Sequence, residues 1–419
     1  MAVMSFRENL RNRDFVLFWL AQLISQFGDR INQMALVGLV AGPHLGSAIE
    51  LAKLLAFTII PVFIVGPIAG VYVDRWDRRT TLFVCDIIRG LIVLLIPLVF
   101  MDRASMWPIY IVVFLVFCLS RFYVPAKMSI IPELVDPEHL HAANSLSTVT
   151  GMIAFVAGAL LGGLIVEYGG ARGGFICDAF TFFISAFLVS LLARPRLRLR
   201  PRELMREGRD MASTYRNVVQ EAFAGVRYIA ANREIRYIIQ LMMVLFMAAG
   251  AIYVVIIVFV QDSFGSKTKD LGFLAVALGL GLFLGSLAYG KWGDKKKHVE
   301  TIFACLIAGG AFMAVFAILV DAWRNLWVAL GLALVLGCVV GPIVIAANTV
   351  VHKVASQEMQ GKVFAAMEFA IHAAFLVTML LSAKLSEVVS RSWILATVGL
   401  LFSLCGIVGL YRYSRRTAA

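Results

Sequence analysis

Polar side chains recur along one face of the first long apolar segment. The segment 15–41 is typical of a helix that is apolar apart from one stripe, which consists of Gln22, Gln26, Asp29 and Gln33 with Asn32 beside them. Residues three and four positions apart share a helix face. A carboxylate at mid-bilayer costs about 2.5–3.5 kcal/mol, so Asp29 should face protein or water. The stripe predicts a solute path in which Asp29 exchanges protons; a structural ion pair of Asp29 with Arg89 or Arg30 is the alternative.

A second pair of groups suited to proton transfer lies near the C-terminus. Glu368 and His372 are one helical turn apart in the predicted helix 363–386 and can meet on one face. A buried Glu beside a His can pass a proton. Lys362 lies less than two turns before Glu368, so a surface ion pair of these two residues is the alternative.

Enzyme, metal and nucleotide chemistry find little support in the sequence. The six cysteines lie in or beside apolar segments without CxxC spacing or a histidine cluster, which is typical of small hydrophobic residues. The segment 285–291 fits GxxxxGK, but Trp292 follows it and has no hydroxyl group for Mg²⁺. A membrane-embedded enzyme would need catalytic groups clustered near one surface, and no Ser/His/Asp set is evident. We therefore expect no enzymatic activity, metal or cofactor.

A charged loop follows the second apolar segment. It contains Gly70, Asp74, Arg75, Arg78 and Arg79. Ion pairs between these side chains and neighbouring helix ends would form a latch that stabilises one of two helix arrangements. Charge that only directs membrane orientation is the alternative. A weaker copy of the loop favours the latch, and we assign further residues to the same network; these are Gly290, Asp294 and Lys295 in the copy, and Asp86, Arg89 and Arg121 in the helices.

Membrane helices are the elements that must position these groups. Of the 419 residues, 61% are hydrophobic and only 15% are charged, against roughly a quarter charged in a soluble chain. Apolar runs of roughly 20 residues cross the ~30 Å hydrocarbon layer as helices, and they lack the alternation of barrel strands. The predicted spans are 15–41, 51–73, 80–101, 107–126, 144–166, 174–193, 236–260, 271–291, 300–320, 326–348, 363–386 and 392–411.

The long hydrophilic stretch in the middle of the chain divides the protein. We predict an N-terminal six-helix bundle at 1–193, a cytoplasmic linker at 194–235 and a C-terminal six-helix bundle at 236–419. The linker contains an amphipathic helix that lies on the membrane surface or under the bundle. A solvated linker helix is the alternative.

Positive charge gathers on one side of the predicted spans. Most of the 38 Lys and Arg residues fall in the loops that share a side with both termini, which places that side in the cytoplasm. Because the net charge of +12 lies in such loops, it does not indicate nucleic-acid binding. The N-terminus is polar for too long to open a secretory signal, so we expect the first apolar run to be retained.

Three landmarks recur at nearly one offset and indicate an internal repeat. The motif 12–14 (Asn-Arg-Asp) has a copy at 232–234 (Asn-Arg-Glu), 220 residues later. Gly70 and Gly290 are also 220 residues apart, and Pro125 and Pro342 are 217 apart. The repeat predicts two parallel six-helix halves around a central path, a known transporter arrangement.

The charged loop and its copy resemble a family signature. The pattern GxxxDRxxRR at 70–79 is similar to the signature loop of the major facilitator superfamily, which also has a weaker copy after span eight. Gly158, Gly162 and Gly163 in span five resemble the antiporter motif GxxxGPxxGG, although Ala154 and Ala159 replace its first Gly and its Pro. Small residues at this spacing also let two helices approach closely, so ordinary packing is the alternative.

Shorter motifs resemble one branch of that superfamily. They are 27–29 (Phe-Gly-Asp), 125–127 (Pro-Ala-Lys), 132–135 (Pro-Glu-Leu-Val), 143–146 (Ala-Asn-Ser-Leu) and 360–364 (Gln-Gly-Lys-Val-Phe). They resemble the branch that contains macrolide-efflux proteins, siderophore exporters and lysophospholipid transporters.

The resemblance implies an all-α protein of twelve membrane helices in two pseudo-twofold-related bundles. We further expect a monomeric, proton-coupled exporter of an amphipathic small molecule of drug or siderophore type, which works by alternating access in a bacterial inner membrane. Its partners would be that substrate, protons and the lipid bilayer, without nucleic acid. Flipping of a lysophospholipid is the alternative. A channel would usually show rings of residues from a symmetric oligomer, which a single chain with an internal repeat does not need.

Overall fold

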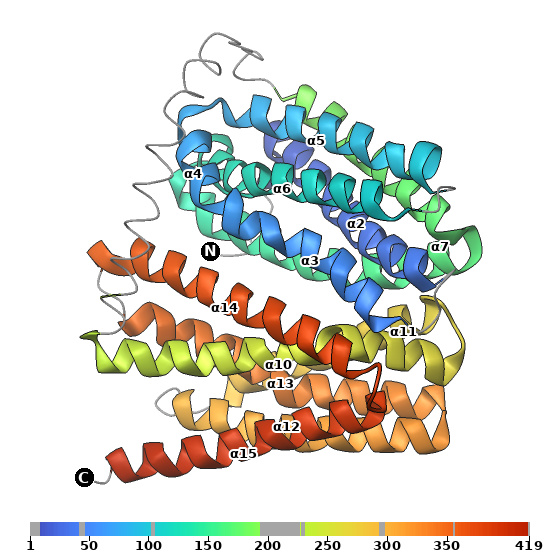
Figure 1. Ribbon diagram of the computed structural model, residues 1–419. Helices are drawn as coiled ribbons and strands as arrows, with labels where there is room; N and C mark the ends of the chain where they lie inside the picture. The colour runs from blue at the N-terminus through green and yellow to red at the C-terminus, as the bar shows by residue number, and fades with distance from the viewer. Residues whose placement is uncertain are drawn as a thin grey trace. The chain divides into compact units, whose positions relative to one another are not determined.

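The computed structural model describes residues 9–41, 47–101, 105–192, 227, 231–292, 298–354 and 357–417, and over these it contains helices and no strands (Figure 1). The all-helical fold predicted from the sequence is confirmed. Almost all of the central linker, together with Asp294 and Lys295, lies outside the described residues.

The helices of the N-terminal part run from α2 to α7. They are α2 (Arg13–Ala41), α3 (Ala48–Ile64), α4 (Gly66–Arg75), α5 (Arg78–Leu95) with the π-helical turn η1 (Ile96–Phe100), α6 (Trp107–Leu134), the 3-10 turn η2 (Pro137–His139) and α7 (Leu140–Ser190). The C-terminal part contains α10 (Arg233–Phe264), α11 (Lys269–Trp292), α12 (His298–Trp323), α13 (Leu326–Val354), α14 (Gln357–Leu385) and α15 (Arg391–Thr417).

The predicted spans correspond to these helices. Within the described part of the chain, nine helices are long and apolar enough to cross a membrane, and the pair α3 and α4, bent by 56°, makes a tenth span. One of the nine covers 54 residues, Pro137–Ser190, which is enough for two crossings. It is interrupted at Gly170 (φ 71°, ψ 171°), between the predicted spans 144–166 and 174–193. The first predicted span is α2, which carries the polar stripe and is not among these nine helices.

Local sequence explains where several helices begin or bend. Asn12 caps α2 because its Oδ1 accepts the backbone N–H groups of Asp14 and Phe15 at 3.1 and 3.2 Å. Asp77 caps α5 in the same way, accepting Thr80 N–H at 2.7 Å. Pro97 has no N–H for the helical ladder, and η1 at this position bonds Met101 N–H to Ile96 C=O over five residues.

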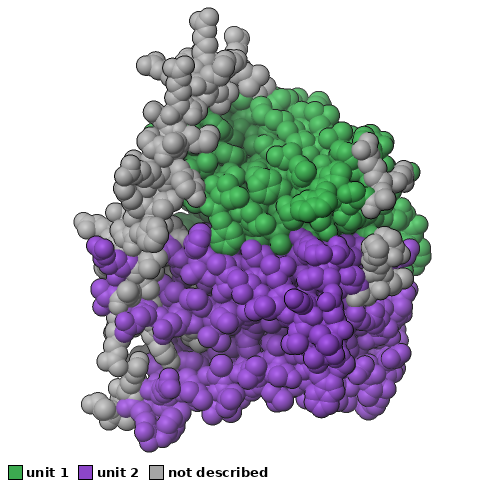
Figure 2. Space-filling model, in the orientation of Figure 1, with its two compact units in different colours: residues 1–39, 54–221 green, residues 40–53, 222–419 purple. Residues whose placement is uncertain are grey.

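The chain divides into two compact units, residues 1–39 with 54–221 and residues 40–53 with 222–419 (Figure 2). In the first unit, α5 packs against α6 and α7, and α4 packs against α6. In the second, α11 packs against α13, α12 against both α13 and α15, and α10 against α14. The expected linker boundaries at 193 and 235 stay a prediction, because most of the residues between them are not described.

Glycines permit the close helix contacts of the second unit. A Cβ atom at Gly285 of α11 would overlap the backbone of Cys338 on α13, and one at Gly310 of α12 would overlap the backbone of Gly399 on α15. In lipid, helix association depends on such close packing, since the hydrophobic effect does not drive helices together there.

Candidate functional site

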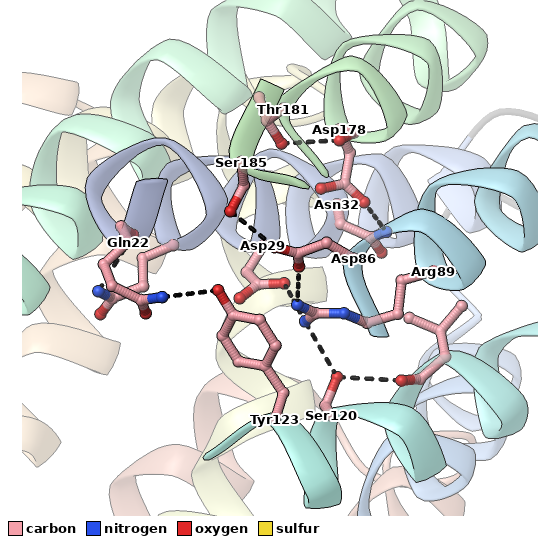
Figure 3. Close-up of polar contacts among 12 residues, drawn as sticks. Gln22, Asp29, Asn32, Asp86, Arg89, Ser120, Tyr123, Asp178, Thr181 and Ser185 are labelled. Carbon is pink, nitrogen blue, oxygen red and sulfur yellow. Dashed lines mark hydrogen bonds and ion pairs between the residues drawn. The ribbon is translucent and has the colours of Figure 1, made fainter. Parts of the chain in front are cut away.

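Four helices of the first unit bring together a set of polar residues that we call the polar cluster (Figure 3). Its members are Asp29 and Asn32 on α2, Asp86 and Arg89 on α5, Ser120 and Tyr123 on α6, and Asp178 and Ser185 on α7. Charged and polar groups inside membrane helices are costly to bury, so such a group is a candidate functional site.

The centre of the polar cluster is an ion pair within α5. Asp86 and Arg89 are three residues apart, so they share a helix face, and Arg89 Nη2 donates to Asp86 Oδ1. Both side chains are fully buried, with 0% and 1% of their surfaces exposed. Ser185 Oγ donates to the second carboxylate oxygen of Asp86 at 2.6 Å. The Asp86 carboxylate is therefore matched by a charge and by a hydroxyl donor.

Aromatic rings enclose the Arg89 guanidinium. Its central carbon lies 4.1 Å from the ring centre of Tyr123 and 4.3 Å from that of Phe182. Arg89 Nη1 also donates to Ser120 Oγ at 3.4 Å. Cation–π contacts of this kind contribute ~2 kcal/mol or more when they are shielded from water. The guanidinium is thus held in one position by α6 and α7.

Asp29 approaches this ion pair from α2. Its Oδ1 lies 3.8 Å from Arg89 Nη1, and 46% of its side chain is exposed while its partner is buried. Arg30 turns elsewhere, donating to Gln33 Oε1 at 2.8 Å and lying over the Phe155 ring at 4.8 Å. Of the two ion pairs considered for Asp29, the structure therefore has the one with Arg89. The carboxylate remains accessible at the edge of the polar cluster.

The rest of the α2 stripe is partly occupied by protein contacts. Gln22 is buried and its Nε2 donates to Tyr123 Oη on α6 at 2.7 Å. Gln26 Nε2 donates to the backbone carbonyl of Gln22 at 3.2 Å. Asn32 is buried and its Nδ2 donates to Asp178 Oδ2 on α7. Asp29 is therefore a half-exposed carboxylate among amides, of which Gln22 and Asn32 join α2 to its neighbours and Gln26 bonds within α2.

Asp178 is a member of the polar cluster that the sequence analysis did not identify. It is fully buried, and its Oδ1 has no hydrogen-bond partner. The approach of α7 to α2 depends on Gly28, because a Cβ atom there would lie 2.7 Å from Asp178 Oδ1 and would overlap Thr181 Oγ1. A charged residue type inside the predicted span 174–193 was the available signal.

The charged loop between α4 and α5 is fixed to other helices of its own unit. Arg78 Nη1 pairs with Glu133 Oε1 near the end of α6. Arg79 is buried and donates to the C-terminal end of α7, at the carbonyls of Val189 (3.1 Å) and Ser190. The end of α4 also packs against α6, where the rings of Trp76 and Phe122 stack with centres 5.6 Å apart.

Other residues assigned to the latch are placed differently. Asp74 and Arg75 are exposed at the end of α4, and Gly70 lies within α4, where a Cβ atom would meet nothing within 4 Å. Gly290 on α11 is equally open. Asp86 and Arg89 join Asp29 and Ser185 in the polar cluster, whereas Arg121 is half-buried on α6 directly after Ser120.

The remaining candidate residues lie on α7 and α14. A Cβ atom at Gly158 would lie 2.7 Å from Arg30 Cβ, and one at Gly162 would lie 3.0 Å from Ile31 Cα, so both glycines face α2. Gly163 is buried on the same helix. On α14, Glu368 is exposed and its backbone carbonyl, rather than its carboxylate, lies 2.8 Å from His372 Nδ1. Among the residues described, no three His, Cys, Asp or Glu side chains are arranged to hold a metal ion.

Known proteins share both the sequence pattern and the fold of this chain. The profile of the family described as the Major Facilitator Superfamily matches residues 18–378. Macrolide efflux protein A of Streptococcus pyogenes is 23% identical over 311 residues, which cover 73% of each chain. The multidrug efflux pump Tap of Mycolicibacterium fortuitum is 25% identical over 416 residues, which cover 96% of each.

A solved structure shows the same fold. It is a bacterial homologue of the iron transporter ferroportin in its inward-facing state, 14% identical, with a TM-score of 0.68 over 96% of this chain and 99% of that one. At this level of identity the likeness concerns the fold alone.

Proposed function

Because the chain belongs to the major facilitator superfamily, we propose that it is a proton-coupled exporter of amphipathic small molecules that works by alternating access. Proteins of this family are transporters, so this multi-pass membrane protein is a transporter and not an enzyme. The direction, the coupling ion and the kind of substrate are the proposed parts.

Export is supported by the relatives. Macrolide efflux protein A and the multidrug efflux pump Tap are both named as efflux proteins. Tap aligns over almost the whole of this chain. A macrolide-like or siderophore-like compound, with an apolar body and polar groups, is the substrate class that we propose. Both termini would lie in the cytoplasm of a bacterial cell, and a single chain would suffice.

Proton coupling is supported by one observation, the position of Asp29. Its half-exposed carboxylate lies 3.8 Å from the buried Arg89 guanidinium. Protonation of Asp29 would remove the attraction that holds this part of α2 to α5, so proton binding changes the free energy of a helix contact. An exporter needs such a link, because the proton gradient is its energy source; one charge moving across 100 mV supplies ~2.3 kcal/mol.

Alternating access would use the two repeated halves as rocking bodies. In the first half, the anchored loop at 70–79 would hold α4 and α5 to α6 and α7 through Arg78 and Arg79. That half would then move as one body while Asp29 exchanges its proton. The glycines on α7 that face α2 would allow the tight packing that such a body requires.

The test is transport by purified wild-type protein in sealed vesicles. A macrolide, a siderophore and a lysophospholipid are each offered with and without an imposed pH gradient. We expect the macrolide or the siderophore to accumulate only with the gradient. Movement of the lysophospholipid alone, or accumulation that ignores the gradient, would contradict the proposal.

A further inference from the structure

The polar cluster contains three carboxylates and one guanidinium, and the three carboxylates differ in the hydrogen-bond and ion-pair partners that they have. Asp86 accepts from Arg89 and from Ser185, and Asp29 lies 3.8 Å from Arg89 at the exposed edge. Asp178 has neither a cationic partner nor contact with solvent: it is fully buried, and among the described residues no ion pair is recorded for it. If all three carboxylates were ionised, the cluster would carry a net charge of −2.

The immediate surroundings of Asp178 suit a neutral carboxylic acid. Asn32 Nδ2 donates to its Oδ2, which is one hydrogen bond from an uncharged amide. Its Oδ1 is buried and has no hydrogen-bond partner. Transfer of an isolated ionised carboxylate into an apolar environment is far more costly than transfer of a neutral polar group, so such groups usually take up a proton.

Nearby hydroxyl groups are engaged with other acceptors. Thr181 Oγ1 donates to the backbone carbonyl of Asp178 at 2.7 Å, and not to its carboxyl group. Ser185 Oγ donates to Asp86 at 2.6 Å. The backbone of α2 closes the remaining side, because a Cβ atom at Gly28 would already lie 2.7 Å from Asp178 Oδ1. A charged Asp178 would therefore have Asn32 as its one recorded side-chain donor.

The charges that face Asp178 also favour a proton there. Three charged side chains act on Asp178: Asp29 on α2 and Asp86 on α5 are negative, and Arg89 on α5 is positive. Tyr123, from α6, contacts the guanidinium of Arg89, and Arg89 is already paired with Asp86. One cation therefore serves two other carboxylates before it can compensate Asp178.

We propose that Asp178 is a proton-binding site, filled in this conformation, with the proton on Oδ1 and Asn32 donating to Oδ2. The cluster then carries a net charge of −1, and the excess lies on Asp29, the one carboxylate of the three that is half-exposed. Because Asn32 lies on α2 and Asp178 on α7, their hydrogen bond links the protonated carboxyl group to the contact between these two helices. Its use during transport rests on the proposed function, whereas the presence of the proton does not.

Infrared spectroscopy of the purified, lipid-reconstituted protein tests this site without any substrate. The carbonyl stretch of a protonated carboxylic acid is resolved from that of a carboxylate and shifts in D₂O. At neutral pH we expect the wild type to show this band, Asp178→Asn to lose it, and Asp29→Asn to retain the Asp178 contribution. The exposed Asp136→Asn is the matched control for the substitution.

A second variant covers the case in which Asp178→Asn does not fold. Asn32→Leu keeps the carboxyl group but removes the donor to Oδ2, so the band should move to higher frequency. An unchanged band in both variants, or no such band in the wild type, overturns the proposal. If Asp178→Asn loses the band but the wild type exports no compound under a pH gradient, the proton site stands and the proposed function is contradicted. If the wild type exports a compound under the gradient but the band is unchanged in the variants, the proposed function stands and the proton site is contradicted.

Discussion

The buried ion pair on α5 allows a quantitative prediction. Removal of one partner from a buried ion pair costs about 3–5 kcal/mol, because the other charge is left uncompensated. Asp86→Asn leaves Arg89 with Asp29 at 3.8 Å and with two aromatic rings, so we expect the lower end, about 3 kcal/mol. Arg89→Met leaves Asp86 with Ser185 alone and with the negative Asp29 nearby, so we expect the upper end, about 5 kcal/mol.

The double variant discriminates between an ion pair and two independent residues. Independent effects would add to about 8 kcal/mol. Because the double variant leaves no fully buried charge unpaired, and Asp29 is half-exposed, we expect it to lose less than about 4 kcal/mol. Unfolding in mixed detergent micelles, followed by tryptophan fluorescence, gives the free energies. Additive losses would refute the assignment of Asp86 and Arg89 as one charged unit.

An exposed ion pair in the same unit is the control for this cycle. Arg78 and Glu133 pair with 33% and 43% of their side chains exposed. Exposed pairs contribute ~0.2–1 kcal/mol. The cycle of Arg78→Met and Glu133→Gln should therefore show a coupling below about 1 kcal/mol, several-fold smaller than that of the buried pair.

Further predictions concern helix contacts. Gly28→Ala should lower the free energy of unfolding by about 1–3 kcal/mol, because the new Cβ overlaps Thr181 and crowds Asp178. Gly290→Ala, whose Cβ meets open space, should stay close to wild type. Equal unfolding free energies of the two variants would contradict the close approach of α2 to α7. Arg79→Met should cost about 1–3 kcal/mol, since the buried guanidinium loses its bonds to two carbonyls at the end of α7. The exposed Arg75→Met should cost at most about 0.5 kcal/mol. Similar losses in both variants would show that Arg79 does not anchor the loop.

The helices were largely predictable from the sequence because each apolar run has the length of a membrane crossing. The break in α7 is an example, since the predicted spans 144–166 and 174–193 leave a gap that contains Gly170, where the backbone has φ 71°. The first helix was found in spite of its lower hydropathy, because its polar residues share one face. The central linker stays a prediction, since most of it lies outside the described residues.

The polar cluster was only partly predictable. Asp29 and Arg89 could be named as partners from their types, and the spacing of Asp86 and Arg89 places them on one face of α5. Which neighbour that face meets depends on how α5 is rotated against α2, α6 and α7, and the sequence does not state that rotation. Asp178 was missed for the same reason, because its environment is created by the close approach of α7 to Gly28.

Transport by reconstituted Asp29→Asn protein tests the central claim most directly. The uptake of the identified substrate is compared with that of wild type and of Asp136→Asn, in vesicles with and without a pH gradient and at matched protein content. We expect Asp29→Asn to lose the accumulation driven by the gradient, while Asp136→Asn keeps it and all three proteins fold and insert into the vesicles. Wild-type accumulation by Asp29→Asn under the gradient would contradict the role of Asp29 in proton coupling.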